Sequence, residues 1–217
     1  MNPKIIFDFI GKKNPKYDLV NVIKNKPPSL FGGINFDPYL IKYIDNLPEE
    51  IQREIVEHAP MRIKYINNPI DEVLIHAIDN DVYNVRHMKN PTERVQLYAV
   101  EKNPYVVNSI DNATEKVQIT VVEKSIYHIS SIKNPTEKVQ LYVVNQEPEL
   151  IMVIKNPTEM VQILVVKKDP RNYLFIKNPA ESVTDFYNKI LKDRKIPHDN
   201  VLYLKTQEII KKMHKNK

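Results

Sequence analysis

Residues that could support catalysis or hold a metal are few and scattered in this 217-residue chain. Cysteine is absent, which excludes disulfides, thiolate metal sites and cysteine nucleophiles. The six histidines follow no metal-ligand spacing, and no G-x-S-x-G motif or glycine-rich phosphate loop occurs. The adjacent glycines Gly32 and Gly33 indicate a turn. We therefore expect no enzyme activity, no metal, no cofactor and no small-molecule substrate.

Seven acidic residues recur at a spacing of 22, and paired carboxylates are the usual acid and base of hydrolytic sites. These residues are Glu49, Asp71, Glu93, Glu115, Glu137, Glu159 and Glu181. Each follows an asparagine by three positions, and proline directly follows five of those asparagines. An Asn-Pro-Thr-Glu segment predicts a helix start with Asn as N-cap, Pro at the first helical position and the acid reaching back to the cap. This structural role accounts for the acids without catalysis.

Apolar residues share the same period. Counted from each repeated asparagine as zero, positions five, nine and twenty are almost all Val, Ile or Ala. Positions five and nine lie one helical turn apart, so each unit is predicted to begin with an α-helix of about 11 residues from the proline. A second start follows at Pro60, Val82, Pro104, Ile126, Pro148 and Pro170, with room only for a short α or 3₁₀ helix.

No single unit of this kind can enclose a core, so neighbouring units must stack. The sequence thus predicts an all-α, right-handed superhelical solenoid of about seven units. The Asn-Pro start followed by Val-x-Leu-x-Val-Val resembles the variant leucine-rich repeats, in which an α-helix alternates with a 3₁₀ helix, and is similar to a shortened HEAT-type unit. The period is slightly shorter than in the leucine-rich variant, Val replaces Leu and Ala, and that family's cysteine cluster is missing. The resemblance covers residues 37–187 and implies a binding scaffold without naming its partner.

Three regions are predicted: an N-terminal cap over 1–36, the repeat array over 37–187, and a capping helix with a basic tail over 188–217. The stretch 46–187 carries 16 basic and 20 acidic residues, whereas the two ends are basic. A mildly acidic array argues against a general nucleic-acid binder. The chain lacks a signal-peptide pattern and a long apolar run, so we expect a soluble cytoplasmic protein with no membrane partner. Its abundance of Asn, Ile and Lys suggests a bacteriophage, a giant virus or a low-GC bacterium, and a viral source would place it in the host cytoplasm or the virion.

Two groups of side chains are candidates for partner binding. The first varies along the long helices, at positions four and eight, and comprises Arg94, Lys116, Lys138, Tyr98 and Tyr142. The second lies on the short segments and comprises Tyr83, Tyr105 and Tyr127, in line with Tyr39. For both groups the alternative is that the tyrosine rings cover the core and only their hydroxyls reach water. The glutamine column Gln96, Gln118, Gln140 and Gln162 is interpreted as structural, with amides that satisfy loop carbonyls.

These patterns leave three functional hypotheses. The first is a non-catalytic scaffold that binds another protein through a variable surface. The second is nucleic-acid binding through the basic ends, including Lys211, Lys212, Lys215 and Lys217. The third is a structural component of a viral assembly, tethered by the basic tail.

Overall fold

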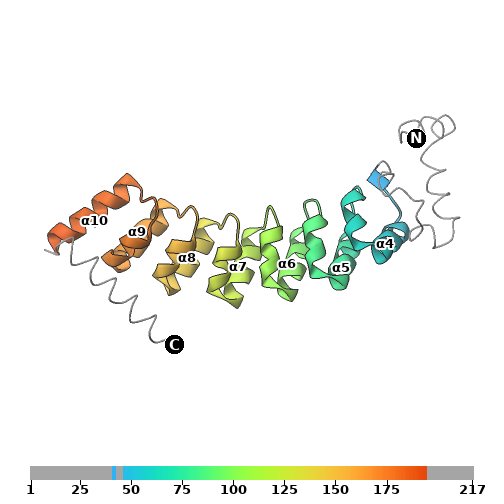
Figure 1. Ribbon diagram of the computed structural model, residues 1–217, viewed down its shortest axis with the longest axis horizontal. Helices are drawn as coiled ribbons and strands as arrows, with labels where there is room; N and C mark the ends of the chain where they lie inside the picture. The colour runs from blue at the N-terminus through green and yellow to red at the C-terminus, as the bar shows by residue number, and fades with distance from the viewer. Residues whose placement is uncertain (1–40, 43–45, 195–217) are drawn as a thin grey trace. The chain divides into compact units, whose positions relative to one another are not determined.

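The computed structural model describes residues 41–42 and 46–194. Between Glu49 and Asp193, seven α-helices alternate with six 3₁₀ helices, and the described residues contain no strand. The chain divides into two units, Met1–Ala113 and Thr114–Lys217 (Figure 1). The predicted cap over 1–36 and the basic tail lie outside the described residues.

The described part of the first unit has two layers. The α-helices pack side by side in chain order, and so do the 3₁₀ helices. The elements are α4 (Glu49–His58), η3 (Pro60–Tyr65), α5 (Asp71–Asn80), η4 (Val82–His87), α6 (Glu93–Lys102) and η5 (Pro104–Ser109). Because each helix contacts the equivalent helix of its neighbour, this unit is a solenoid of stacked repeats.

The second unit has the same two layers. Its elements are α7 (Glu115–Lys124), η6 (Ile126–Ser131), α8 (Glu137–Gln146), η7 (Pro148–Val153), α9 (Glu159–Lys168), η8 (Pro170–Phe175) and α10 (Glu181–Asp193). Successive α-helices pack together, as do successive 3₁₀ helices. The last helix is longer than the others, with 13 residues against 10.

The predicted core register is confirmed. Positions five and nine are buried in every repeat, for example Val95 and Ala99 in α6 and Val139 and Val143 in α8. Position ten is buried with them from Val56 to Val166, so each α-helix presents a broad apolar face. Each such face closes a core only against the next helix, which is why the units stack.

The second predicted start is also confirmed, and the short element is a 3₁₀ helix. The fourth residue is buried in five of the six 3₁₀ helices: Ile63, Val85, Val107, Ile129 and Ile151. In η8 the equivalent Tyr173 is half-buried and stacks on buried Tyr187, with ring centroids 4.1 Å apart. Burial raises the pKa of Tyr187, as does the neighbouring Tyr173.

The predicted helix cap is wrong by two residues. The N-cap of α8 is Thr136 and its first residue is Glu137, so Asn134 and Pro135 precede the helix. The Thr136 hydroxyl accepts the Val139 N–H at 3.5 Å. The repeated asparagine instead lies where the chain turns, and in the first three repeats it adopts positive φ, at 55° for Asn46, 52° for Asn68 and 46° for Asn90. Asparagine tolerates this left-handed region better than most residues.

Candidate functional site

The glutamine column joins adjacent loops, as the structural interpretation predicted. The Nε2 of Gln140 donates to Pro135 O at 2.9 Å and to Asn156 O at 3.4 Å, and its Oε1 accepts the Thr158 N–H at 3.0 Å. The side chain is only 3 % exposed. Gln96 makes the same bonds to Pro91 O and Asn112 O. Buried amides with satisfied partners are committed to the fold and are not available to a ligand.

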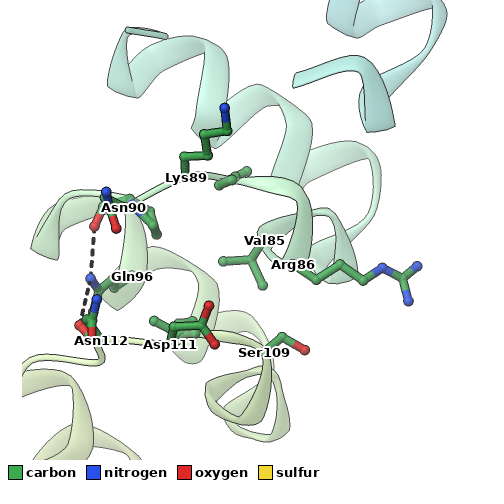
Figure 2. Close-up of a pocket in the computed structure, with 11 residues that line it drawn as sticks. Val85, Arg86, Lys89, Asn90, Gln96, Ser109, Asp111 and Asn112 are labelled. Atoms are coloured by element: carbon green, nitrogen blue, oxygen red, sulfur yellow. Dashed lines mark hydrogen bonds between the residues drawn. The ribbon is translucent and has the colours of Figure 1, made fainter. Parts of the chain in front are cut away.

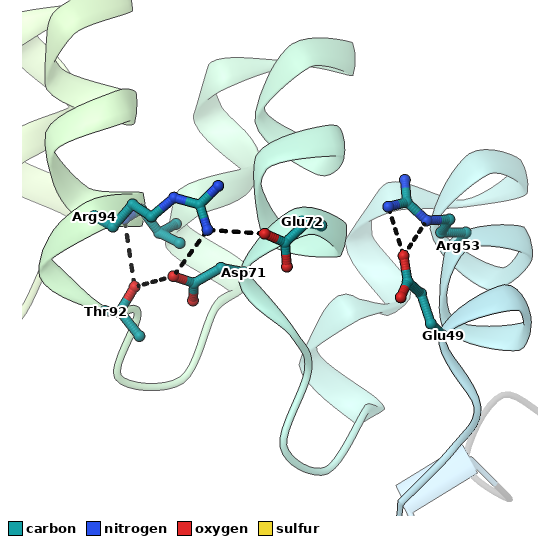
Figure 3. Close-up of polar contacts among 7 residues, drawn as sticks. Glu49, Arg53, Asp71, Glu72, Thr92 and Arg94 are labelled. Carbon is teal, nitrogen blue, oxygen red and sulfur yellow. Dashed lines mark hydrogen bonds and ion pairs between the residues drawn. The ribbon is translucent and has the colours of Figure 1, made fainter.

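Several of the repeated acids, including Asp71, Glu115 and Glu159, accept a hydrogen bond from the next repeat. Glu115 accepts the Thr136 hydroxyl at 2.9 Å and pairs with Lys138 Nζ at 3.1 Å. The hydrogen bond from Thr136, and then the charge and hydrogen bond of Lys138, lower the pKa of Glu115. In the first unit the Thr92 hydroxyl donates to Asp71 Oδ2 at 2.8 Å (Figure 3). Sequence reasoning assigned these acids to their own helix start and missed this contact between repeats, although the threonine that directly precedes four of the seven acids was an available signal.

The predicted stripe on the long helices is largely engaged in such contacts. The guanidinium of Arg94 in α6 pairs with Glu72 at 2.8 Å and lies 3.8 Å from Asp71, and both carboxylates belong to the neighbouring helix α5 (Figure 3). The hydrogen bond from Arg94 lowers the pKa of Glu72. Lys138 pairs with Glu115, and Lys116 is exposed. These cations therefore serve the stacking of repeats as well as the surface.

The two tyrosines of that stripe are half-buried. Tyr98 donates its hydroxyl to Asp79 Oδ1 at 2.6 Å, and Lys102 pairs with the same carboxylate at 2.8 Å. The Lys102 Nζ also lies 5.1 Å from the centre of the Tyr98 ring. Hydrogen bonds from Lys102 and then Tyr98 lower the pKa of Asp79. Tyr142 occupies the equivalent position in α8 and is likewise half-buried.

The second predicted stripe is the more exposed of the two. Tyr83, Tyr105 and Tyr127 are 46 %, 58 % and 60 % exposed and occupy the second position of η4, η5 and η6. Two of their hydroxyls bond to the next repeat, since Tyr83 accepts from Asn103 at 3.3 Å and Tyr127 donates to Glu147 at 2.7 Å. The Glu147 carboxylate raises the pKa of Tyr127.

Exposed apolar side chains missed by the sequence interpretation extend this surface within each unit. Met61 occupies the second position of η3 and is 54 % exposed, in line with Tyr83 and Tyr105. In the second unit, Met152 and Val153 on η7 and Leu174 on η8 are also exposed. The available signal for Met152 and Val153 was their register, because they follow the buried core residue Ile151 by one and two positions. The lysines predicted at 211, 212, 215 and 217 lie outside the described residues.

Two open clefts lie along the loop edge of the first unit. One, of about 460 Å³, is lined by Val85, Met88, Ile110 and polar groups of the neighbouring loops. Figure 2 shows that Gln96 is bonded to both flanking loops there, while Arg86 extends away from it. The other cleft, of about 700 Å³, lies where Leu74 takes the glutamine position. The second cleft includes the Thr92 hydroxyl and the Asp71 carboxylate, which are hydrogen-bonded to each other at 2.8 Å across adjacent repeats.

Within the described residues, no cluster of three or more His, Asp or Glu side chains could hold a metal ion, and no helix is long and apolar enough to cross a membrane. Comparisons with protein-family models, curated proteins and solved structures find no match to this chain. The chain is therefore described by its architecture, a tandem array of α-helix and 3₁₀-helix units.

Proposed function

We propose that the chain is a non-catalytic scaffold that binds another protein through the exposed side of its 3₁₀ helices. One observation carries this proposal: Met61, Tyr83 and Tyr105 occupy the same position on three consecutive 3₁₀ helices, and about half of each side chain is open to water. A recurrent row of large apolar groups is typical of an interaction surface rather than of a solvated face.

The residue types support protein binding. Tyrosine and methionine are enriched at interfaces, and tyrosine buries much area at a modest loss of side-chain entropy. Polar residues that recur along the array are bonded between repeats, as Gln140 and Thr136 are. The stripe with Tyr98 and Tyr142 varies along the array, and variation between repeats is expected of a surface that binds a partner.

The repeat itself supports a wider relationship. We extend the proposal to kinship with the variant leucine-rich or shortened HEAT-type repeats, because a ten-residue α-helix alternates with a six-residue 3₁₀ helix. The composition supports a phage, giant-virus or low-GC bacterial source, and with it a scaffold acting in the cytoplasm or a virion. These statements are proposals on architecture and composition.

Affinity capture from cells of the source organism, followed by mass spectrometry, tests the scaffold proposal. The bait is the full chain, and extracts are treated with nuclease. Tyr83→Ala with Tyr105→Ala should weaken capture of the partner by about 2 kcal/mol or more, without changing helix content by circular dichroism. Tyr98→Ala with Tyr142→Ala is the matched variant for the other stripe and reports whether that surface also contributes.

Removal of residues 211–217 is the control for nucleic-acid binding. A protein partner should be retained by the truncated chain and should depend little on salt, whereas nucleic-acid binding falls steeply with salt. The scaffold proposal is refuted if both double-alanine variants capture the partner normally and the deletion of residues 211–217 abolishes capture. In that case the basic end would carry the function.

A further inference from the structure

The 3₁₀ helices of the first unit carry a second exposed row beside the apolar one. In a 3₁₀ helix, side chains three residues apart lie directly above one another. The second and fifth residues of each helix therefore share a side, which pairs Met61 with Lys64 and Tyr83 with Arg86. All four side chains are exposed. The result is an apolar row flanked by cations, which we term the η3–η5 surface.

The two cations of this surface differ from other cations of the unit. Arg53, Arg94 and Lys102 each have a carboxylate oxygen within 2.6–2.8 Å. Lys64 and Arg86, in contrast, pair with no carboxylate among the described residues, and Lys64 Nζ lies 4.9 Å from the Tyr65 ring centre. Their charges are consequently available to an anionic partner.

The electrostatic surroundings agree with this view. His87, the last residue of η4, has a lowered pKa, caused first by burial and then by the positive charges of Arg86 and Lys64. A local positive region therefore exists on a unit whose residues 46–113 carry 11 acidic and 7 basic side chains.

We infer that the η3–η5 surface binds an extended acidic peptide segment of a partner protein, with apolar side chains between the acids. Packed helices lie about 8–10 Å apart, and an extended chain in the polyproline II conformation advances about 3.1 Å per residue with three residues per turn. Three peptide residues therefore match one repeat, and carboxylates at every third residue lie on one side of the peptide, where they would meet Lys64 and Arg86 in turn. The intervening apolar residues would contact Met61, Tyr83 and Tyr105.

Single-stranded nucleic acid could also place anions and stacking groups on such a surface. The acidic excess of the unit opposes a polyanion with one phosphate per nucleotide, whereas a peptide with spaced carboxylates meets only the local cations. The peptide is therefore the occupant that the charges favour. This inference rests on the proposed scaffold function and specifies the chemistry of its partner.

Fluorescence anisotropy with the full chain tests the inference at physiological salt. The probe is a labelled peptide that repeats Asp-Leu-Ser, and the comparison probes are a Lys-Leu-Ser repeat and oligo-uridylate of matched charge. We expect saturable binding of the Asp peptide only. Lys64→Glu with Arg86→Glu should weaken it about ten-fold or more, and Tyr83→Ala with Tyr105→Ala should have a similar effect.

The matched control is Lys155→Glu with Lys177→Glu, which makes the same charge change at exposed sites of the second unit. It should alter peptide binding less than about two-fold. Equal weakening by the two charge reversals, no binding of the Asp peptide, or tighter binding of oligo-uridylate would each overturn the inference. Capture of a native protein partner that is unaffected by Lys64→Glu with Arg86→Glu would refute this inference and leave the scaffold function standing.

Discussion

Replacing Gln140 with leucine tests whether the glutamine column holds the repeats together. The Gln140 amide makes three hydrogen bonds, to Pro135 O at 2.9 Å, to Asn156 O at 3.4 Å and from the Thr158 N–H at 3.0 Å. Leucine fills a similar volume but removes all three, and leaves the Thr158 N–H and the Pro135 carbonyl without these partners. The experiment thus separates hydrogen bonding from packing at one buried position.

The magnitude follows from the geometry. The two shorter bonds contribute about 1 kcal/mol each, and an unsatisfied, partly buried group costs about 1–3 kcal/mol. Leucine offsets about 1–2 kcal/mol of this loss, because it buries apolar surface and loses less side-chain entropy on folding than glutamine. The net destabilisation should be about 2 kcal/mol, measured as a shift of the urea midpoint by circular dichroism. Hydrogen exchange provides a local reporter, because the Thr158 amide should exchange faster once it loses the Gln140 acceptor.

The chain contains its own control for this substitution. Leu74 occupies the same position in α5 and is 3 % exposed, and there the Thr92 N–H donates to no acceptor among the described residues. Leu74→Gln would supply that acceptor and lose apolar burial, so its stability should stay within about 1 kcal/mol of the parent. If Gln140→Leu matches the parent in both urea midpoint and Thr158 exchange, the structural role assigned to the column is wrong.

Three further outcomes are expected. Val139→Asp should unfold the array locally or wholly, because it buries an unpaired charge at a fully buried site, and a melting temperature within a degree or two of the parent would contradict the core register. Thr136→Val should lower the free energy of unfolding in urea by about 1–2 kcal/mol, because it removes the N-cap and the hydrogen bond to the preceding repeat. Asn134→Ala, outside the helix, should lower it by less. The reverse order would show that Asn134 is the N-cap. Asp79 has a lowered pKa owing mainly to the hydrogen bond from Lys102, so its contribution to stability is present above its ordinary pKa of 3.8 and is lost as the pH falls below that value. The melting temperatures of Asp79→Asn and the parent should therefore converge in acid. A constant difference would exclude this linkage.

Much of the fold was predictable because the repeat makes one local rule visible many times. The spacing of Val95, Val139 and their equivalents predicted a helical face, and burial of every member confirmed it. The second helix start was predicted to the residue at Pro104 and Pro148. The cap register was not predictable, because Asn and Thr are both good N-caps and local propensity cannot rank them. Thr136 is selected by a contact outside its own helix, the carboxylate of Glu115 in the preceding repeat.

The candidate surface shows the same division. The sequence by itself determined which tyrosines recur and that Gln140 is committed to structure, because period and residue type suffice for both. Only the tertiary structure decided that Tyr98 is tied to Asp79 while Tyr105 stands exposed, since exposure depends on which neighbouring element covers a side chain. It likewise separated engaged cations, such as Arg94, from those that pair with no carboxylate in the described part of the chain, such as Arg86. The physical reason is that pairing and burial arise between repeats, and a one-dimensional period does not encode which side chains meet across that distance.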